Sequence, residues 1–182
     1  MTEEYLDILN ERGEKTGEKR SYAEAHRIGL LHRAVHVWFL NSKKQLLLQK
    51  RSKNKIAHPS CWDISVAGHA SSGQTSIEAA KRETEEEIGL TLLDEAYEYL
   101  FTVRRVREVI NKGTYVNNEF QDVFLVHSDI SIEDLVLPPD EVEEVRWLDI
   151  SEFKKWIAGQ GEAIVPHDEE YKRLLEHLEV RH

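Results

Sequence analysis

The sequence predicts an α+β fold in which helices cover both faces of a mixed β-sheet, an α/β/α sandwich. Runs of β-branched and aromatic residues indicate strands, runs with helical periodicity indicate helices, and the two kinds do not alternate strictly. The 182 residues contain no repeat of fixed period, low-complexity tract or Pro/Gly/Ser-rich linker. We therefore predict one domain over residues 1–182.

The first 70 residues carry several predicted strands. Apolar runs flanked by turn-forming residues are typical of strands, and we expect the two such runs that flank a short turn to pair as a hairpin. We expect an edge strand at Tyr5–Leu9, a turn at Asn10–Gly13 and a helical turn at Tyr22–His26. The hairpin consists of the strands Ala34–Leu40 and Gln45–Arg51, joined by a turn at Asn41–Lys44. A further short strand is expected at Trp62–Ala67.

One helix, Ser76–Ile88, has clear signals at both ends. Thr75 and Glu78 have the spacing of a capping box, in which the two residues satisfy each other's free backbone N–H groups. The run contains neither Gly nor Pro and stops before Gly89, a residue suited to the left-handed conformation that ends helices.

The chain after this helix continues as a mixture of strands and helices. A loop that contains Gly113 is expected to join the first two strands. The predicted strands are Tyr97–Val109, Glu119–His127 and Glu144–Leu148, and the predicted helices are Ile150–Ile157 and Glu169–Leu178.

The Ser76–Ile88 helix carries three glutamates that cluster on one face, Glu83, Glu86 and Glu87, because residues three and four apart are neighbours. A neighbouring stripe of mostly apolar residues on the same helix can pack against the hydrophobic core. Clustered carboxylates are hard oxygen ligands of the kind that hold magnesium. Taken alone, the cluster fits an ordinary solvated acidic face better than a metal site. The docking stripe is Ile77, Ala80, Thr84 and Ile88.

Composition and charge narrow the possible partners. The formal net charge of −10 argues against a nucleic-acid polymer as partner. A lone cysteine, Cys61, excludes an intrachain disulfide and a thiolate-rich zinc cluster. No stretch approaches the roughly 18 uninterrupted apolar residues of a membrane helix, and the acidic start does not resemble a secretory signal. We therefore expect a cytoplasmic protein that does not bind membranes.

The segment 68–90 resembles the Nudix box: glycine, five residues, glutamate, seven residues, then Arg-Glu-aliphatic-any-Glu-Glu-any-Gly-aliphatic. A pattern of this length is far more specific than a lone glycine loop. Two positions depart, with Gln74 in place of the first glutamate and Thr84 in place of an aliphatic residue. The matching residues are Gly68, Arg82, Glu83, Glu86, Glu87, Gly89 and Leu90.

This resemblance implies a Nudix-type fold and the hydrolysis of a diphosphate bond by water. It implies that Mg²⁺ or Mn²⁺ is the cofactor, with the box glutamates as ligands and the carbonyl of Ala67 or Gly68 as a further oxygen. In the family, the first glutamate is thought to pair with the box arginine, here Arg82. Gln74 can accept a hydrogen bond but brings no charge, which predicts weaker loop geometry or metal affinity.

About 120 residues beyond the box resemble a branch of the superfamily, the type I isopentenyl-diphosphate isomerases. In those enzymes, the equivalents of Arg51 and Lys55 contact the diphosphate. The catalytic cysteine is replaced here by Ala67, with Cys61 six residues earlier. One glutamate ligand is Asn117 here, and the first histidine ligand is displaced to His26. The equivalents of His32, His69 and Glu119 bind a divalent metal in the isomerases.

These features favour a hydrolase that acts on a small nucleoside or isoprenyl diphosphate. Two alternatives stay open, an isomerase and a catalytically weak diphosphate-binding module, for which Gln74 is the one argument. We expect Glu119 to serve as a ligand or base, and His36 to be an ordinary core or surface histidine. Segments 104–118 and 159–168 are expected to determine specificity. The sequence leaves the oligomeric state open.

Overall fold

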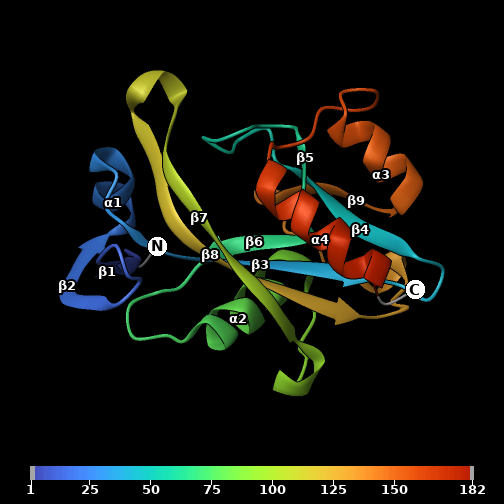
Figure 1. The fold of residues 1–182 in the computed structure, drawn as a ribbon, viewed down its shortest axis with the longest axis horizontal. Coiled ribbons are helices and arrows are strands. Elements are labelled where there is room, and N and C mark those ends of the chain that lie inside the picture. Colours follow the sequence, from blue (N-terminus) through green and yellow to red (C-terminus); the bar gives the residue numbers. More distant parts are fainter. Residues whose placement is uncertain (1–2, 181–182) are drawn as a thin grey trace.

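The computed structural model describes residues 3–180, and within them strands and helices form the layers shown in Figure 1. The strands are β1 (Tyr5–Leu9), β2 (Lys15–Ser21), β3 (His32–Leu40), β4 (Gln45–Arg51), β5 (Trp62–Asp63), β6 (Val66–His69), β7 (Glu98–Ile110), β8 (Tyr115–His127) and β9 (Val142–Asp149). The helices are α1 (Tyr22–Ile28), α2 (Ser76–Ile88), α3 (Ile150–Ile157) and α4 (Asp168–Val180), with one-turn 3-10 helices at Asp94–Ala96, Asn111–Gly113 and Ile132–Asp134.

The main sheet is mixed, as the sequence predicts. Its strand path is β5-β4-β3-β8-β7, with β6 added to β3 and β9 added to β4. The β3–β8 pair is parallel, and the other pairs are antiparallel. A separate hairpin of β1 and β2 lies beside α1 at one end of the sheet (Figure 1).

The predicted hairpin of β3 and β4 is wrong except at its turn. The two strands are paired at Leu40 and Leu46, and they then diverge. Beyond that point, β6 pairs with the freed edge of β3 and β5 pairs with the freed edge of β4, while β9 pairs with the opposite edge of β4 along its whole length. A short turn between two apolar runs signals a hairpin locally, whereas the competing partners β5 and β6 come from residues 62–69, outside both runs. The divergence matters for function because the separated strands line a cavity.

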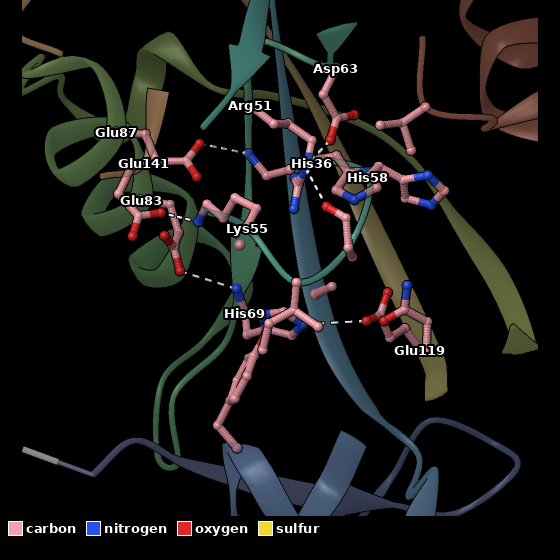
Figure 2. Close-up of a pocket in the computed structure, with 18 of the residues that line it drawn as sticks. His36, Arg51, Lys55, His58, Asp63, His69, Glu83, Glu87, Glu119 and Glu141 are labelled. Atoms are coloured by element: carbon pink, nitrogen blue, oxygen red, sulfur yellow. Dashed lines mark hydrogen bonds and ion pairs between the residues drawn. The ribbon is translucent and has the colours of Figure 1, made fainter. Parts of the chain in front are cut away.

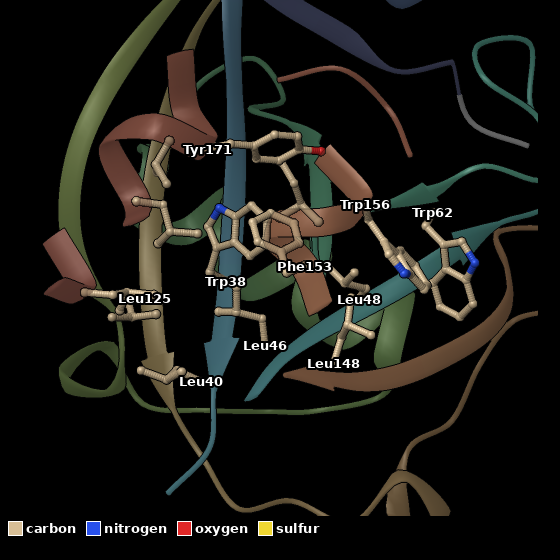
Figure 3. Packing of buried hydrophobic residues seen from close by; sticks show 14 of the residues in the cluster. Trp38, Leu40, Leu46, Leu48, Trp62, Leu125, Leu148, Phe153, Trp156 and Tyr171 are labelled. Atoms are coloured by element: carbon tan, nitrogen blue, oxygen red, sulfur yellow. The ribbon is translucent and has the colours of Figure 1, made fainter. Parts of the chain in front are cut away.

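Two hydrophobic cores lie on opposite faces of the sheet, and β3 contributes to both by alternation. Trp38 faces α3 and α4, where it packs edge-to-face on Phe153 and Tyr171 (Figure 3). Val37 and Phe39 face the other way, in the core that contains Ala79 and Ala80 of α2. A fully buried aromatic side chain contributes about 2–3 kcal/mol, so these layers hold the sheet in place.

Helix α2 has the predicted bounds and caps. The Thr75 side chain accepts from the Glu78 amide, the Glu78 carboxylate accepts from the Thr75 amide, and Gly89 has a φ of 74°. The docking face, however, includes two of the clustered glutamates, since Glu83 and Glu87 are buried with their apolar neighbours. An ordinary solvated acidic face therefore does not describe this helix.

Two segments differ from the sequence prediction. Strand β2 is absent from it, because its residues are polar and mostly exposed and carry no periodic apolar signal. The segment 104–118, expected to be a specificity loop, is largely the extended β7–β8 hairpin. No helix within residues 3–180 is long and apolar enough to cross a bilayer.

Candidate active site

A cavity of about 720 Å³ opens where β3 and β4 diverge, and Figure 2 shows part of its lining. Its walls come from β3, β6, β8, helix α2 and the connection between β4 and β5. His32 lies behind the wall, fully buried. The other predicted site residues line the cavity: Arg51, Lys55, Ala67, His69, Arg82, Glu83, Glu86, Glu87 and Glu119.

Backbone N–H groups of β6 hold the two buried glutamates of α2. The amide of Ala67 donates to Oε2 of Glu87 at 3.1 Å, and the Gln49 side chain donates to the same oxygen at 2.8 Å. The amide of His69 donates to Oε1 of Glu83 at 3.1 Å. A Cβ at Gly68 would lie 2.0 Å from Cδ of Glu83, so this close approach requires glycine.

Burial changes the acidity of both carboxyl groups. It raises the pKa of Glu83 to about 7, although the Arg82 guanidinium opposes the rise. It raises the pKa of Glu87 to about 8, and repulsion from Glu83 adds to the effect. Two carboxylates that resist ionisation side by side are stabilised when a divalent cation neutralises them. Their donor chemistry fits Mg²⁺ or Mn²⁺.

Arg82 cross-links the glutamates of the helix. Its guanidinium donates to Glu86 at 2.7 Å, to Glu83 at 2.8 Å and to the carbonyl of His69 at 2.7 Å. Glu86 is the exposed member of the cluster, with 57% of its side chain accessible. At the position where the Nudix box has a glutamate, Gln74 accepts from the Ser71 amide at 3.0 Å and from Arg82 at 3.4 Å.

A second cluster gathers three imidazoles around Glu119. The Nε2 atoms of His26, His32 and His69 lie 3.8, 3.5 and 3.3 Å from one oxygen of that carboxylate. The parallel register places His32 opposite Glu119, and α1 brings His26 to them. Although burial alone would raise the pKa of Glu119, the three surrounding imidazoles, of which His69 lies within hydrogen-bond distance, hold that pKa well below its usual range.

The tautomers of two imidazoles leave metal-binding nitrogens free. Nδ1 of His26 is 2.9 Å from the carbonyl of Tyr22, and Nδ1 of His32 is 2.8 Å from that of Leu30, so both must donate. Their buried Nε2 atoms have no hydrogen-bond partner among the described residues. Burial lowers the pKa of His69 to about 4, which keeps its ring neutral. This donor set fits a transition metal such as Mn²⁺ or Zn²⁺.

His69 connects the two clusters, as Figure 2 shows. Its backbone amide contacts Glu83, and its ring contacts Glu119. The cationic residues lie on another wall, where Arg51 donates to Asp63 at 3.0 Å and Lys55 pairs with Glu141. Cys61 is not among the described residues that line the cavity. It therefore does not supply the thiol that is missing at Ala67.

A third group of polar residues, which the sequence did not predict, contributes His36, Asp63 and His167 to the lining of the cavity. His36 donates from Nδ1 to Glu170 at 2.7 Å, and Glu170 also accepts from Trp38 at 2.8 Å. His167 lies 3.0 Å from Asp63. These side chains satisfy one another, unlike His26 and His32. Glu170 lies over a hundred residues from His36, and so does His167 from Asp63, so local sequence signals could not reveal these two pairs.

Strand β6, the loop after it and the capped, glutamate-bearing helix α2 form a strand-loop-helix acidic site on a mixed sheet. This combination defines the class of protein. The NUDIX domain model matches residues 30–168, and the chain belongs to the Nudix family.

The chain is 42% identical to Nudix hydrolase 3 of Arabidopsis thaliana over 186 residues, all of this chain but only 24% of that relative's length. It is 34% identical to an uncharacterized Nudix hydrolase of Listeria monocytogenes, over 88% of each chain. An isopentenyl-diphosphate Delta-isomerase of Shigella flexneri is 31% identical, over 91% of this chain and 88% of its own. The crystal structure of DR0079 from Deinococcus radiodurans matches with a TM-score of 0.75 and 28% identity, over 93% and 98% of the chains.

Proposed function

We propose that this protein is a metal-dependent hydrolase that cleaves the diphosphate bond of a small molecule. The observation that carries the proposal is the burial of Glu83 and Glu87 against β6, beside Glu86, in a cavity that also contains Arg51 and Lys55. Burying two adjacent carboxylates is costly for folding and is offset when they bind cations. The basic residues supply contacts for an anionic substrate.

Each residue has a distinct task in the proposed reaction. Glu83, Glu86 and Glu87 would hold Mg²⁺ or Mn²⁺, with the Ala67 carbonyl as a further ligand, and Arg82 orients two of them. When bound, the cations neutralise the charge that develops on the phosphate oxygens. The water oxygen bonds to phosphorus, the bridging P–O bond breaks, and a carboxylate of the cluster accepts the water proton.

The imidazole cluster is proposed as a second metal site in the same cavity. His26, His32, His69 and Glu119 present the ligands, and the two orphaned nitrogens support this assignment. This site also favours the isomerase as a second candidate function. Ala67 argues against it, because the thiol that isomerisation uses is missing and Cys61 does not line the cavity.

Substrates of two kinds suit the cavity, nucleoside diphosphates and isoprenyl diphosphates. Its volume of about 720 Å³ lies in the usual range for small-molecule sites. The similarity to a named Nudix hydrolase and to isopentenyl-diphosphate isomerases supports including both kinds in an assay.

The decisive experiment measures phosphate and nucleotide release from a panel of nucleoside, sugar-nucleotide and isoprenyl diphosphates, with and without Mg²⁺. We expect Mg²⁺-dependent release that Glu86→Gln and Glu87→Gln abolish. Glu85→Gln is the matched control, since this glutamate is exposed on the same helix but does not line the cavity.

Full activity in either ligand variant would refute the ligand assignment. Ligand binding without turnover across the panel would favour the binding module, and deuterium incorporation into isopentenyl diphosphate without phosphate release would favour the isomerase.

A further inference from the structure

The Arg82 guanidinium has three carboxylates within ion-pair distance: Glu83, Glu86 and Glu4. The first two are candidate metal ligands, so a bound cation competes with Arg82 for their oxygens. Gln74, which also contacts Arg82, is neutral. Glu4 is therefore the anionic partner that Arg82 keeps when the cluster is occupied.

Two hydrogen bonds and an ion pair fix the position of Glu4. Its Oε1 accepts from the Ser71 hydroxyl at 2.7 Å and lies 3.8 Å from Nη2 of Arg82. Its backbone carbonyl accepts from the amide of Tyr22 at 2.8 Å, which ties it to the start of α1. One carboxylate oxygen thus contacts both the loop before α2 and the arginine of α2.

Strand β1 runs alongside this same loop. Leu6 and Ser71 form an antiparallel bridge, and the Ser72 amide donates to the carbonyl of Tyr5 at 2.6 Å. The Asp7 carboxylate accepts from the Gly73 amide at 3.0 Å and from the Ser72 hydroxyl at 2.7 Å. The N-terminal strand therefore fixes the loop that carries Gln74 and leads into the carboxylate helix.

We infer that Glu4 is a positioning residue that supplies, from just before strand β1, the negative charge which Gln74 does not bring to Arg82. The inference rests on the proposed function of the carboxylate helix. It explains how Arg82 can stay oriented beside a neutral side chain at position 74. It also assigns the β1–β2 hairpin, which lies outside the segment matched by the NUDIX domain model, a role in the site.

A double-mutant cycle tests the inference through metal binding by the metal-free protein. Glu4→Gln should lower the Mn²⁺ affinity, measured by titration calorimetry, about two- to fivefold, as expected for a partly exposed ion pair. Gln74→Glu places a carboxylate where the present side chain already contacts Ser71 and Arg82. In its presence, Glu4→Gln should have little effect, because the arginine then has a second anionic partner.

Glu18→Gln, in strand β2 of the adjoining hairpin, is the control, since it removes the same charge at an exposed site whose ion-pair partner is Arg20, at 3.4 Å. Thermal unfolding of each variant verifies that the fold is intact. An equal loss of affinity in both backgrounds, no loss at all, or the same loss in Glu18→Gln would overturn the inference.

The substrate panel separates this inference from the proposed function. A protein that binds Mn²⁺ with the expected non-additivity but hydrolyses nothing would retain the role of Glu4 and refute the hydrolase. A metal-dependent hydrolase with additive effects in the cycle would retain the function and refute the role of Glu4.

Discussion

The substitution Glu87→Gln should stabilise the metal-free protein while destroying its proposed activity. Both hydrogen bonds to this side chain, from Gln49 and from the Ala67 amide, arrive at the same oxygen. A glutamine can place its carbonyl oxygen there and keep both bonds. What it removes is the ionisation of a buried carboxyl group.

The magnitude follows from the difference between the folded and unfolded pKa of Glu87, about 8 against an ordinary 4.5. A group with a raised folded pKa contributes stability that is fully present below the unfolded pKa and is lost as the pH rises through the folded pKa. Each pKa unit corresponds to 1.36 kcal/mol. Allowing for relaxation of the site, the variant should be more stable than the wild type by about 2–4 kcal/mol at pH 8, and by under about 1 kcal/mol at pH 5.

Urea unfolding followed by tryptophan fluorescence, with EDTA present, measures this difference at both pH values. Saturating Mg²⁺ should then reverse the order, because the wild type gains stability by binding and the variant does not. Its phosphate release should fall by at least about a hundredfold. Equal stability of the two proteins at pH 8 without metal would show that Glu87 is not held in a site unfavourable to its charge, and would refute this reasoning. Glu86→Gln, at the exposed member of the cluster, should give no such gain.

Three further predictions concern other parts of the cavity. His26→Ala should weaken Zn²⁺ binding by about tenfold or more, measured by competition with a chromophoric chelator, and unchanged affinity would exclude His26 as a ligand. Gly68→Ala forces a Cβ against Glu83 and should lower the free energy of unfolding by about 1–3 kcal/mol in urea; an unchanged value would mean that the strand and helix separate easily. Although burial alone would lower the pKa of His36, Glu170 raises it, so their pair stabilises the fold below that raised pKa and less at higher pH. Glu170→Gln removes the anionic partner of the buried His36, which should cost about 3 kcal/mol at pH 6. At about 2–4 °C per kcal/mol for a chain of this size, the melting temperature should fall by about 6–12 °C at pH 6 and by less at pH 9, and a pH-independent change would contradict the ion pair.

Elements with local signals could be predicted to the residue. The capping box at Thr75 and the glycine at its far end give α2 its observed bounds, and the turn at residues 41–44 sets the start of β4. Strand β2 has no comparable signal, because its polar side chains face solvent and it is a strand only through its pairing with β1. The divergence of β3 from β4 depends on β5 and β6, which pair with the two separated edges and lie outside a short window around the turn.

The residues of the candidate site also differ in whether a local sequence signal could predict them. The glutamates of α2 belong to one continuous motif, so their spacing along the helix could place them together. His26 stands in helix α1, whereas His32 and His69 stand in strands β3 and β6, and the sequence alone could place His26 only as a displaced ligand. The partnership of His36 with Glu170 joins β3 to the last helix of the described chain, and it depends on how α4 crosses the sheet.

The parallel pairing of β3 with β8 limits where insertions and deletions can occur as the sequence evolves. Nine successive residues are in register, from His32 opposite Glu119 to Leu40 opposite His127. Inserting or deleting one residue within either strand would turn the following side chains to the opposite face and separate the imidazole from its carboxylate. Length changes are instead tolerated in the connections at 52–61 and 128–141, where lengthening a loop costs little. Residues of both connections reach the cavity, so such insertions could alter which molecules enter it while the spacing of the ligands is inherited unchanged.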